Sequence, residues 1–376
     1  MYDIMTPGPT QVRGNVLAAR ALPCTNPDLD PDFFTFYKET CELISSLLHT
    51  GNQTLILDGE GILGLEAACA SLTEPGDRVL VLDNGVFGKG FADFVRIYGG
   101  EPVLYTTDYR HTLDVDALAA FLEKDHDFKY ATVVHCDTPS GMLNDISRIC
   151  PLLNSWGILT VVDSVSAMFG EEVRVDDFCI DLLCGGSQKA VSAPPGLTFV
   201  TISPAAWKTM KERRTPIASF YANLLAFDGY FEKQWFPYTM PISDIRGLRA
   251  AFENIQADSD MLLRHARIAR AVRTALTSCG LRLHTRDGWS NTVSVFDVPA
   301  GTTASAILTA LREDHNLMLA GSFDVLEGQV IRIGHMGENA REEKLAAVMK
   351  ALDAVLAKLG VPLTGRLEEV YRNSLT

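Results

Sequence analysis

The sequence predicts an α/β protein with a mostly parallel seven-stranded sheet, helices on both faces of that sheet, and a smaller C-terminal α+β domain. Three observations lead to this prediction. At 376 residues the chain is too long for one ordinary core and suits two domains. Short runs rich in β-branched residues alternate with helical patterns, and several runs are apolar on both faces, as buried parallel strands are. This alternation ends near residue 257.

The N-terminal elements follow in order. Residues 1–20 are expected to form an arm, because the prolines of Thr6-Pro7-Gly8-Pro9 stiffen the backbone. The large domain is expected over 21–256, and it begins with a helix over 31–49. The seven strands of its sheet are predicted at 54–57, 78–82, 101–106, 131–135, 159–163, 182–185 and 197–202.

The small domain is expected over 257–376. A helix over 259–278 should end at Gly280. Strands at 292–296 and 329–333 should flank a helix at 304–314. The last helix is predicted over 341–359 from the 3-4 spacing of its apolar residues. Asn339 and Glu342 resemble a capping box at its start, and Gly360 should end it.

Composition excludes several classes of function. The net charge of −14, from 33 basic and 47 acidic residues, repels nucleic acids and anionic membranes, so neither is an expected partner. The eight cysteines include no CxxC pair, so we expect free thiols in a reducing cytosol and neither a disulfide framework nor a metal site. The N-terminus lacks a signal-peptide pattern, and no apolar run is long enough to span a membrane.

Polar or glycine-rich turns follow five of the predicted strands. The carboxyl ends of parallel strands meet at one edge of a sheet, where α/β proteins bind ligands. Convergence of five such turns therefore indicates a binding site more strongly than any single motif. The turns are at 58–66, 84–88, 137–141, 163–166 and 185–189.

Asp163 and Lys189 lie in two of these turns. A lysine that forms a Schiff base with a carbonyl needs a pKa below its free value of about 10.4. A pyridine cofactor needs an anion that keeps its ring nitrogen protonated. Either residue alone is more simply a helix cap or a solvated side chain. Together at successive strand ends they favour a site for a pyridine ring.

The other three turns carry weaker signals. The glycine-rich segment 58–66 would expose backbone N–H groups to a phosphate, although such turns are also common for conformational reasons alone. Phe87 could stack on a flat ring or serve as a hydrophobic plug. The hydroxyls of Thr138 and Ser140 could reach a ligand or stabilise their own turn.

These motifs resemble those of the class V aminotransferases of pyridoxal-phosphate fold type I. The branch they resemble most contains the alanine–glyoxylate, serine–pyruvate and 2-aminoethylphosphonate–pyruvate transaminases. The resemblance covers nearly the whole chain. It is carried by Thr6-Pro7-Gly8-Pro9-Thr10, by segments 59–66, 84–88 and 137–141, by Val162-Asp163-Ser164-Val165-Ser166, by Gly186-Ser187-Gln188-Lys189 and by Val330-Ile331-Arg332-Ile333-Gly334-His335-Met336-Gly337.

The resemblance implies pyridoxal 5'-phosphate as the cofactor and gives roles to the matching catalytic residues. Lys189 would form the internal aldimine, and Asp163 would pair with the pyridine nitrogen. Arg332, whose planar guanidinium suits a carboxylate, would bind the substrate together with Gly8.

The resemblance also implies the residues that hold the cofactor. Phe87 would stack on the ring, and Thr138 would bond near the ring hydroxyl. Thr239 resembles a residue that reaches the phosphate of the other subunit, which implies a homodimer with shared active sites. The phosphate itself would be held by Gly59, Glu60, Gly61, Ile62 and Gln188.

The chain departs from the family pattern in two places. Relatives carry Ser or Thr hydroxyls in the phosphate turn, where this chain has Glu60 and Ile62. Because a carboxylate beside a phosphate is unfavourable, we expect Glu60 to point away and backbone N–H groups alone to bind. Relatives often have an arginine after the 84–88 motif, where this chain has Lys89-Gly90. His135 and His335 adjoin family motifs and are expected to be structural.

The implied reaction is a ping-pong transamination from a small amino acid, such as alanine or serine, to glyoxylate or pyruvate, with Lys189 as general base. Alternatives are 2-aminoethylphosphonate–pyruvate transamination, a lyase or desulfurase on the same fold, and an inactive binding protein. A desulfurase is disfavoured because segment 319–328 has no cysteine. An inactive protein is disfavoured because Asp163, Lys189 and Arg332 are all present.

Overall fold

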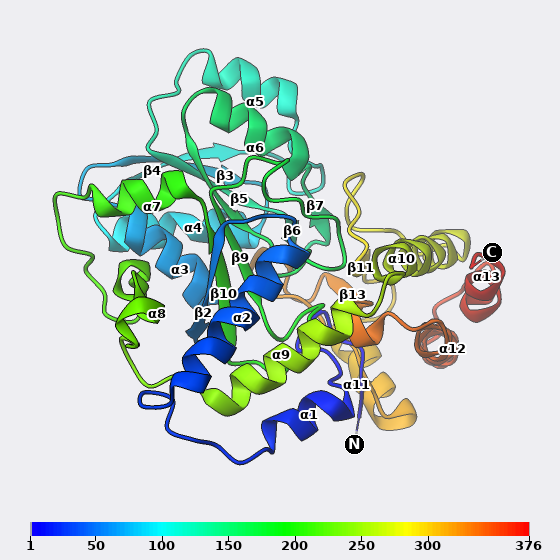
Figure 1. The fold of residues 1–376 in the computed structure, drawn as a ribbon. Helices are drawn as coiled ribbons and strands as arrows, with labels where there is room; N and C mark the ends of the chain where they lie inside the picture. The colour runs from blue at the N-terminus through cyan, green and yellow to red at the C-terminus, as the bar shows by residue number, and fades with distance from the viewer. Residues whose placement is uncertain (1, 376) are drawn as a thin grey trace.

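The computed structural model describes residues 2–375, and within them the predicted seven-stranded sheet forms in the order β2–β10–β9–β8–β5–β3–β4 (Figure 1). In this sheet β10 runs antiparallel to both of its neighbours, and the other pairs are parallel. The strands are β2 (Gln53–Asp58), β3 (Arg78–Asp83), β4 (Glu101–Thr106), β5 (Tyr130–Val134), β8 (Leu159–Asp163), β9 (Leu182–Gly186) and β10 (Leu197–Ile202).

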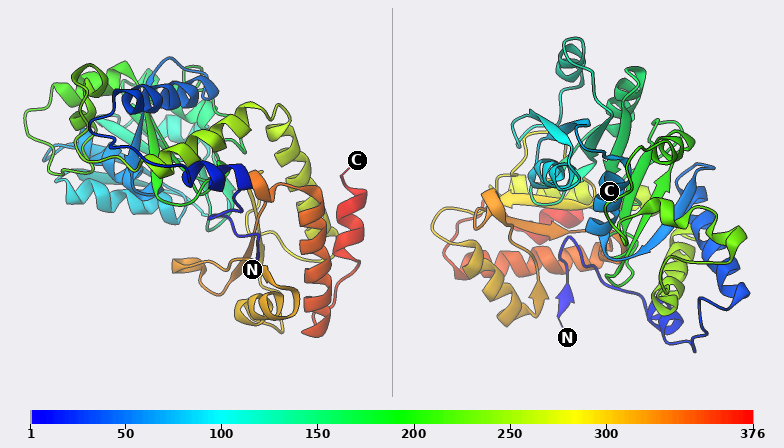
Figure 2. Two further views of the ribbon diagram at one scale, coloured as in Figure 1. Left: turned by 60° about the horizontal axis from the view of Figure 1, so that its bottom comes forward. Right: turned by 90° about the vertical axis from the view of Figure 1, so that its left-hand side faces the viewer.

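Helices cover both faces of this sheet, which explains why its central strands are buried along their whole length. Figure 2 shows α2 on one face and α3 and α4 on the opposite one. The helix α2 begins where predicted, because Pro31 occupies its first turn and the Asp30 side chain accepts a bond from Asp32 N. The helices are α1 (Gly14–Arg20), α2 (Pro31–Leu47), α3 (Gly61–Leu72), α4 (Val86–Ile97), α5 (Val115–Leu122), α6 (Ile146–Ser155), α7 (Pro204–Lys211), α8 (Tyr230–Lys233) and α9 (Ile242–Gln256), with the 3₁₀ helix η1 (Leu224–Phe227).

The C-terminal third forms a second body beside the large sheet, as the yellow to red elements in Figure 1 show. Its small sheet joins β13 to β11 on one side and, through a bridge between Ala320 and Arg332, to the segment after β12 on the other. The elements are α10 (Met261–Ser278), β11 (Val293–Asp297), α11 (Ala304–His315), β12 (Leu317–Met318), η2 (Asp324–Leu326), β13 (Val330–Gly334), η3 (Gly337–Asn339), α12 (Glu342–Lys358) and α13 (Leu367–Asn373).

The start of the arm joins the C-terminal body through a separate two-stranded sheet. The strand β1 (Asp3–Ile4) pairs in parallel with β12, and Met5 is buried in the same apolar cluster as α10, α11 and α12. A short hairpin of β6 (Cys136–Asp137) and β7 (Met142–Leu143) lies beyond β5. The arm therefore joins the C-terminal body, while α1 packs on α9 near the large sheet.

The predicted capping box of α12 is wrong. The cap residue is Arg341, and no side chain bonds to the first N–H groups of the helix. Asn339 instead accepts a bond from Gln11 N at 3.1 Å and donates to Thr6 O, while Glu342 pairs with Arg267 at 2.6 Å. The C-terminal signals are correct: Gly280 and Gly360 both follow helix ends with positive φ, of 90° and 72°.

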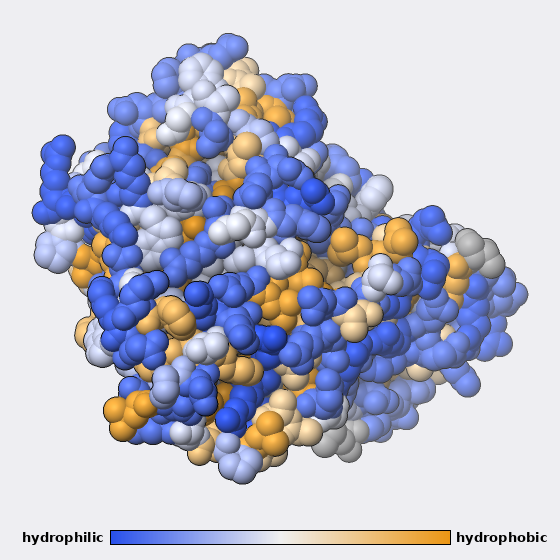
Figure 3. Space-filling view, in the orientation of Figure 1, coloured by the Kyte–Doolittle hydropathy of each residue, from blue (hydrophilic) through white to orange (hydrophobic). Residues whose placement is uncertain are grey.

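Most of the buried apolar side chains fall into two large clusters. One surrounds the seven-stranded sheet, and the other lies between the small sheet and α10 to α13. The predicted boundary near residue 257 falls just before α10, and Met261 at the start of that helix packs in the first cluster. The exterior in Figure 3 is mostly polar, with apolar residues in small separate groups. No helix among residues 2–375 is long and apolar enough to cross a membrane.

Candidate active site

The five predicted turns lie at one edge of the large sheet. Strands β3, β5, β8 and β9 are parallel, and β2 runs in the same direction because β10 is antiparallel to both β2 and β9. Their C-terminal ends therefore share an edge. The small sheet also contributes to this edge, because Arg332 of β13 contacts the 137–141 turn.

Asp163 ends β8 with a buried carboxylate. Its Oδ1 accepts a hydrogen bond from Val165 N at 2.9 Å. Burial raises the pKa of Asp163 to about 7, although the Val165 N–H and the charge of Lys189 both act in the opposite direction. Such a carboxylate is costly to keep ionised without a cation, and a protonated pyridine nitrogen would supply that cation.

Lys189 lies just beyond β9, and its Nζ donates to the carbonyl oxygen of Pro7 at 2.9 Å. Burial of the amine lowers the pKa of Lys189 to about 8, and the charge of Arg332 lowers it further while that of Asp163 raises it. A substantial fraction of the amine is therefore neutral near neutral pH, as a nucleophile requires.

Gly8 lies directly against this lysine. Its φ is +100°, and a Cβ at this position would come within 2.3 Å of Lys189 Cδ. Any larger residue would displace the lysine. Its predicted substrate contact stays a prediction, because the contact that the geometry gives is with Lys189.

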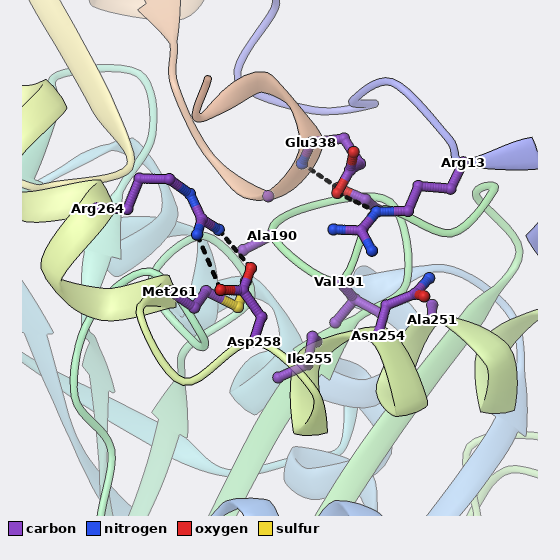
Figure 4. Close-up of a pocket in the computed structure, with 12 residues that line it drawn as sticks. Arg13, Ala190, Val191, Ala251, Asn254, Ile255, Asp258, Met261, Arg264 and Glu338 are labelled. Atoms are coloured by element: carbon purple, nitrogen blue, oxygen red, sulfur yellow. Dashed lines mark hydrogen bonds and ion pairs between the residues drawn. The ribbon is translucent and has the colours of Figure 1, made fainter. Parts of the chain in front are cut away.

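The loop that carries Lys189 packs against α9, α10 and η3. Ala190, Val191 and Ser192 line a small pocket with α9, α10 and η3, which Figure 4 shows together with the Arg13–Glu338 and Arg264–Asp258 ion pairs. Ser192 also accepts a bond from Glu338 N at 2.9 Å. The lysine is thus attached both to the arm and to the C-terminal body.

Phe87 and Asp137 form another wall of the site. The Phe87 N–H donates to Asp137 Oδ1 at 3.0 Å, so the carboxylate fixes the start of α4. The half-buried Phe87 ring meets the ring of Phe323 edge-on, with centroids 6.0 Å apart. The ring also packs against the main apolar cluster, so its stacking on a flat ligand stays a prediction. Thr138 is buried, and its hydroxyl contacts that of Ser166.

Arg332 projects from β13 towards these residues. Its Nη1 donates to Thr138 O at 3.4 Å, its Nε donates to Gly321 O, and its guanidinium lies 5.7 Å from the Phe323 ring centre. Burial lowers the pKa of Arg332 to about 10. Within residues 2–375 no carboxylate lies within ion-pair distance of it. The site thus holds a partly desolvated cation without an ion-pair partner, although the charge of the buried Asp137 acts on it from a longer distance.

The structure contradicts the expectation that Glu60 points away from the phosphate turn. Glu60 caps α3: its Oε1 accepts from Ile62 N at 3.1 Å, and its Oε2 accepts from Gln188 Nε2 at 2.9 Å. The carboxylate bonds here because the first N–H groups of a helix attract an anion. Gly61, next in the turn, lies close to Val165: a Cβ would meet that side chain at 3.0 Å, so Val165 would have to shift slightly.

The remaining predicted residues lie outside this cluster or inside the core. Thr239 is exposed and donates to Asp28 Oδ2 at 2.8 Å, so it contributes nothing to the site of its own chain. His135 is buried against the Ser164 hydroxyl at 3.0 Å. His335 donates from Nδ1 to Asn291 O at 3.0 Å and accepts at Nε2 from Ser294 Oγ. Burial lowers the pKa of both histidines, which agrees with neutral structural roles.

The model of the aminotransferase class-V family matches residues 26–322 of this chain. The chain belongs to the class V aminotransferases. An uncharacterized aminotransferase of Methanocaldococcus jannaschii is 33% identical over 99% of this chain and 97% of its own length. Pyridoxamine–pyruvate transaminase of Mesorhizobium japonicum is 32% identical over 89% and 86%. The crystal structure of ureidoglycine–glyoxylate aminotransferase of Bacillus subtilis superposes with a TM-score of 0.95, at 27% identity and over 100% and 98% of the two chains.

Membership in the class V aminotransferases implies pyridoxal 5'-phosphate, and it establishes fold type I for this chain. The ring end of the site fits that group, because Asp163 offers a buried anion and Lys189 a desolvated amine. The phosphate end fits less well, because the Glu60 carboxylate already occupies its helix N-terminus.

The sequence analysis did not identify three residues that position other side chains of the candidate site. The Pro7 carbonyl holds Lys189, Asp137 organises the Phe87 turn, and Phe323 covers Arg332. The motif Asp137-Thr138 had drawn attention to the hydroxyls of its turn and not to the carboxylate. No local signal distinguishes Phe323, which lies in a loop of the small body.

Proposed function

We propose that this aminotransferase moves an amino group from a small amino acid, such as alanine or serine, to glyoxylate or pyruvate. The observation that carries the proposal is the unpaired Arg332 beside Lys189 and Asp163. A partly buried guanidinium without an ion-pair partner is unfavourable unless a ligand completes it, and both an amino acid and a 2-oxo acid bring a carboxylate. Relatives named for alanine, serine and aspartate with glyoxylate support this class of substrates.

Each residue of the site has its own role in the proposed reaction. When bound, the pyridoxal group supplies an electron sink for the carbanion at the donor's Cα. Asp163 keeps the ring nitrogen protonated, and Lys189 takes the proton from Cα and returns it to the neighbouring carbon as general acid. Arg332 holds the substrate carboxylate, and Phe87 and Phe323 exclude water from that side. The ping-pong cycle of this family uses the same residues for donor and acceptor.

A panel of amino donors tests the proposal directly. The protein is loaded with the cofactor, and alanine, serine, aspartate, pyridoxamine and 2-aminoethylphosphonate are added separately in the absence of an oxo acid. An accepted donor bleaches the visible absorbance, and glyoxylate or pyruvate restores it. If none of the donors that carry an α-carboxylate bleaches the colour, the proposal is wrong. Bleaching by 2-aminoethylphosphonate alone would establish the alternative phosphonate reaction.

Arg332→Lys should raise KM for both donor and acceptor. The replacement keeps the charge but loses the planar fork, so we expect a loss of about 1.5–3 kcal/mol in kcat/KM, the scale of hydrogen bonds to a charged group. The cofactor absorbance should stay unchanged. Steady-state kinetics with both substrates provide the measurement.

Arg273→Lys is the matched control for Arg332. Arg273 is also a buried arginine, but it bonds to Ser290 O at 2.8 Å and to Asn291, away from the site. It should lose thermal stability with normal KM. If Arg332→Lys behaves like this control, Arg332 is structural and the amino-acid substrate loses its main support.

We also propose that the enzyme is a homodimer of the cytosol in which Thr239 reaches the partner's site. Segments 22–28 and 239–246 lie side by side, joined by the Thr239–Asp28 and Arg246–Pro23 hydrogen bonds. Large apolar side chains nearby are exposed, which supports an interface there; they are Leu22, Leu29, Phe220, Tyr221 and Trp235. The cysteines are free thiols, as a reducing compartment requires.

Leu29→Glu should convert the dimer to a monomer. Leu29 is 79% exposed, so a glutamate costs the isolated chain little but places a charge in the proposed interface. Leu263→Glu, at a position 70% exposed on α10, is the control and should stay dimeric. Sedimentation measures both. A monomeric unaltered protein, or equal behaviour of the two variants, would contradict the proposed interface.

A further inference from the structure

Glu60 lies where a cofactor phosphate would have to bind. It caps the twelve-residue helix α3, and its two carboxylate oxygens accept from Ile62 N at 3.1 Å and from Gln188 Nε2 at 2.9 Å. Leu63 N is bonded to the Glu60 carbonyl at 2.9 Å. The carboxylate therefore already uses the Ile62 N–H, which would otherwise be available to a phosphate at this helix N-terminus.

The Glu60 side chain is exposed, and the Lys189 ammonium, whose pKa its charge raises, makes no ion pair with it. Within residues 2–375 its carboxylate has hydrogen bonds only from Ile62 N and Gln188, and it forms no ion pair. A phosphate ester brings roughly 1.5–2 further negative charges near neutral pH. Two anions would then share one helix N-terminus, which is unfavourable at short distance even with partial screening.

The charge of Glu60 also acts on the centre of the site. Burial is the main cause of the raised pKa of Asp163 and of the lowered pKa of Lys189, and Glu60 raises the pKa of both residues. Glu60 is therefore close enough to belong electrostatically to the site that receives the ring. It is more than a remote helix cap.

Helix stability alone gives no reason for a glutamate here. Ser, Thr, Asp and Asn are the residues preferred at this position, because their shorter side chains reach the N–H groups best. A serine or threonine would cap α3 equally well and would leave a hydroxyl for a phosphate. The glutamate replaces that hydroxyl with an anion that can only accept hydrogen bonds.

Gln188 supplies an independent observation. Its amide oxygen Oε1 is buried, lies against Gly186 and has no hydrogen-bond partner. The orientation of the amide is fixed by Glu60, because the reversed amide would place Oε1 against Glu60 Oε2. This end of the site therefore presents one buried acceptor without a donor, Gln188 Oε1, beside the Glu60 carboxylate, whose oxygens already accept one bond each and can accept another. A phosphate dianion has only acceptors, whereas a hydroxyl can donate.

We infer that Glu60 makes the site accept pyridoxal and pyridoxamine, which carry a free hydroxymethyl group, at least as well as their phosphate esters. The hydroxymethyl O–H donates to the acceptor pair, and no second anion is brought to α3. The inference rests on the proposed function in one respect: Asp163 and Lys189 must receive the pyridine ring. It predicts a ring compound that exchanges with solvent instead of one retained by its phosphate.

Calorimetric titration of the cofactor-free protein tests this inference. Pyridoxamine and pyridoxamine 5'-phosphate are the two probes, because neither carries an aldehyde and so neither is captured covalently by Lys189. We expect the unaltered protein to bind pyridoxamine with a Kd equal to or below that of its phosphate. Glu60→Gln and Glu60→Ser should each shift the ratio of the two Kd values towards the phosphate by at least about tenfold.

Glu123→Gln is the matched control. Glu123 is exposed at the end of α5, and its replacement removes one negative charge without touching the site, so the ratio should not move. Melting temperatures of all variants establish that they fold. A preference of the unaltered protein for the phosphate by more than about tenfold, or a ratio that Glu60→Gln and Glu60→Ser leave unchanged, would overturn the inference.

Two different failures are distinguishable. If both probes bind and the phosphate is preferred, Glu60 turns aside when the ester binds, and the donor panel still tests the aminotransferase proposal. If neither probe binds, Asp163 and Lys189 do not receive a pyridine ring, and the inference and the proposed function fall together.

Discussion

Replacement of Lys189 by alanine is expected to abolish turnover. The amine that attacks the carbonyl and moves the Cα proton disappears, and Lys89, which follows the 84–88 turn, is exposed on α4 and cannot replace the buried Lys189 amine. The fold should persist, since the lost hydrogen bond to Pro7 O is one of several contacts of the arm. The measurement is the rate with an accepted donor, together with borohydride reduction and peptide mapping of the labelled lysine.

Lys124→Ala provides the comparison, because Lys124 is an exposed lysine of the same sheet domain. It should retain full activity. Label on any lysine other than Lys189, or substantial turnover by Lys189→Ala, would refute the assignment.

The lowered pKa of Lys189 also gives this reaction a pH dependence. The nucleophile is the neutral amine, and its folded pKa of about 8 lies below its ordinary value of 10.5. The rate at which the cofactor-free protein captures pyridoxal should therefore rise with pH and level off above about 8. The free energy of unfolding changes with pH in the same direction. Between the two pKa values the unfolded chain binds more protons at this lysine than the folded chain does, so the free energy of unfolding rises as pH rises through that window.

Asp163→Asn should weaken ring binding and slow proton transfer severely, with little effect on melting temperature. The buried partner of the ring cation is lost, and loss of one member of a buried charge pair costs about 3–5 kcal/mol. The asparagine can still accept from Val165 N, and it removes a carboxylate whose pKa burial has already raised. Binding calorimetry, single-turnover kinetics and thermal denaturation measure the three effects.

Asp181→Asn is the counterpart for Asp163. Asp181 is another buried carboxylate of the same sheet, but it bonds to Thr160 N and Ser203 Oγ at the opposite strand ends. It should lose stability and keep normal ring binding. Normal activity in Asp163→Asn would show that the ring nitrogen has a different partner.

The sheet could be predicted from the sequence because its strands are apolar on both faces and separated by polar turns. All seven predicted strands agree with the structure within one residue at each end. The two-residue strand β1 could not be predicted, since its partner β12 lies more than 300 residues away and two residues carry no periodicity. The capping box failed for the related reason that Asn339 bonds to the arm and not to its own helix.

For the site, the sequence identified the groups whose chemistry is unusual at a strand end. Asp163, Lys189, Phe87 and Thr138 were found in this way. Arg332, in the middle of β13, was found through the family resemblance, and the structure places it against the 137–141 turn. The direction of the Glu60 side chain was predicted wrongly, because that prediction assumed a phosphate in place and did not weigh the attraction of the helix N-terminus for the carboxylate itself.

The arm has a practical consequence for handling the protein. Residues 3 and 4 pair with β12 in the C-terminal body, and a few residues later the Pro7 carbonyl and Gly8 touch the side chain of Lys189. A displacement of the N-terminal residues therefore affects the Lys189 amine, because only a few residues separate them. An affinity tag fused there, or proteolytic nicking before Thr10, would change the reactivity of Lys189 without touching the sheet that carries it, whereas a C-terminal tag after α13 would leave it unaffected.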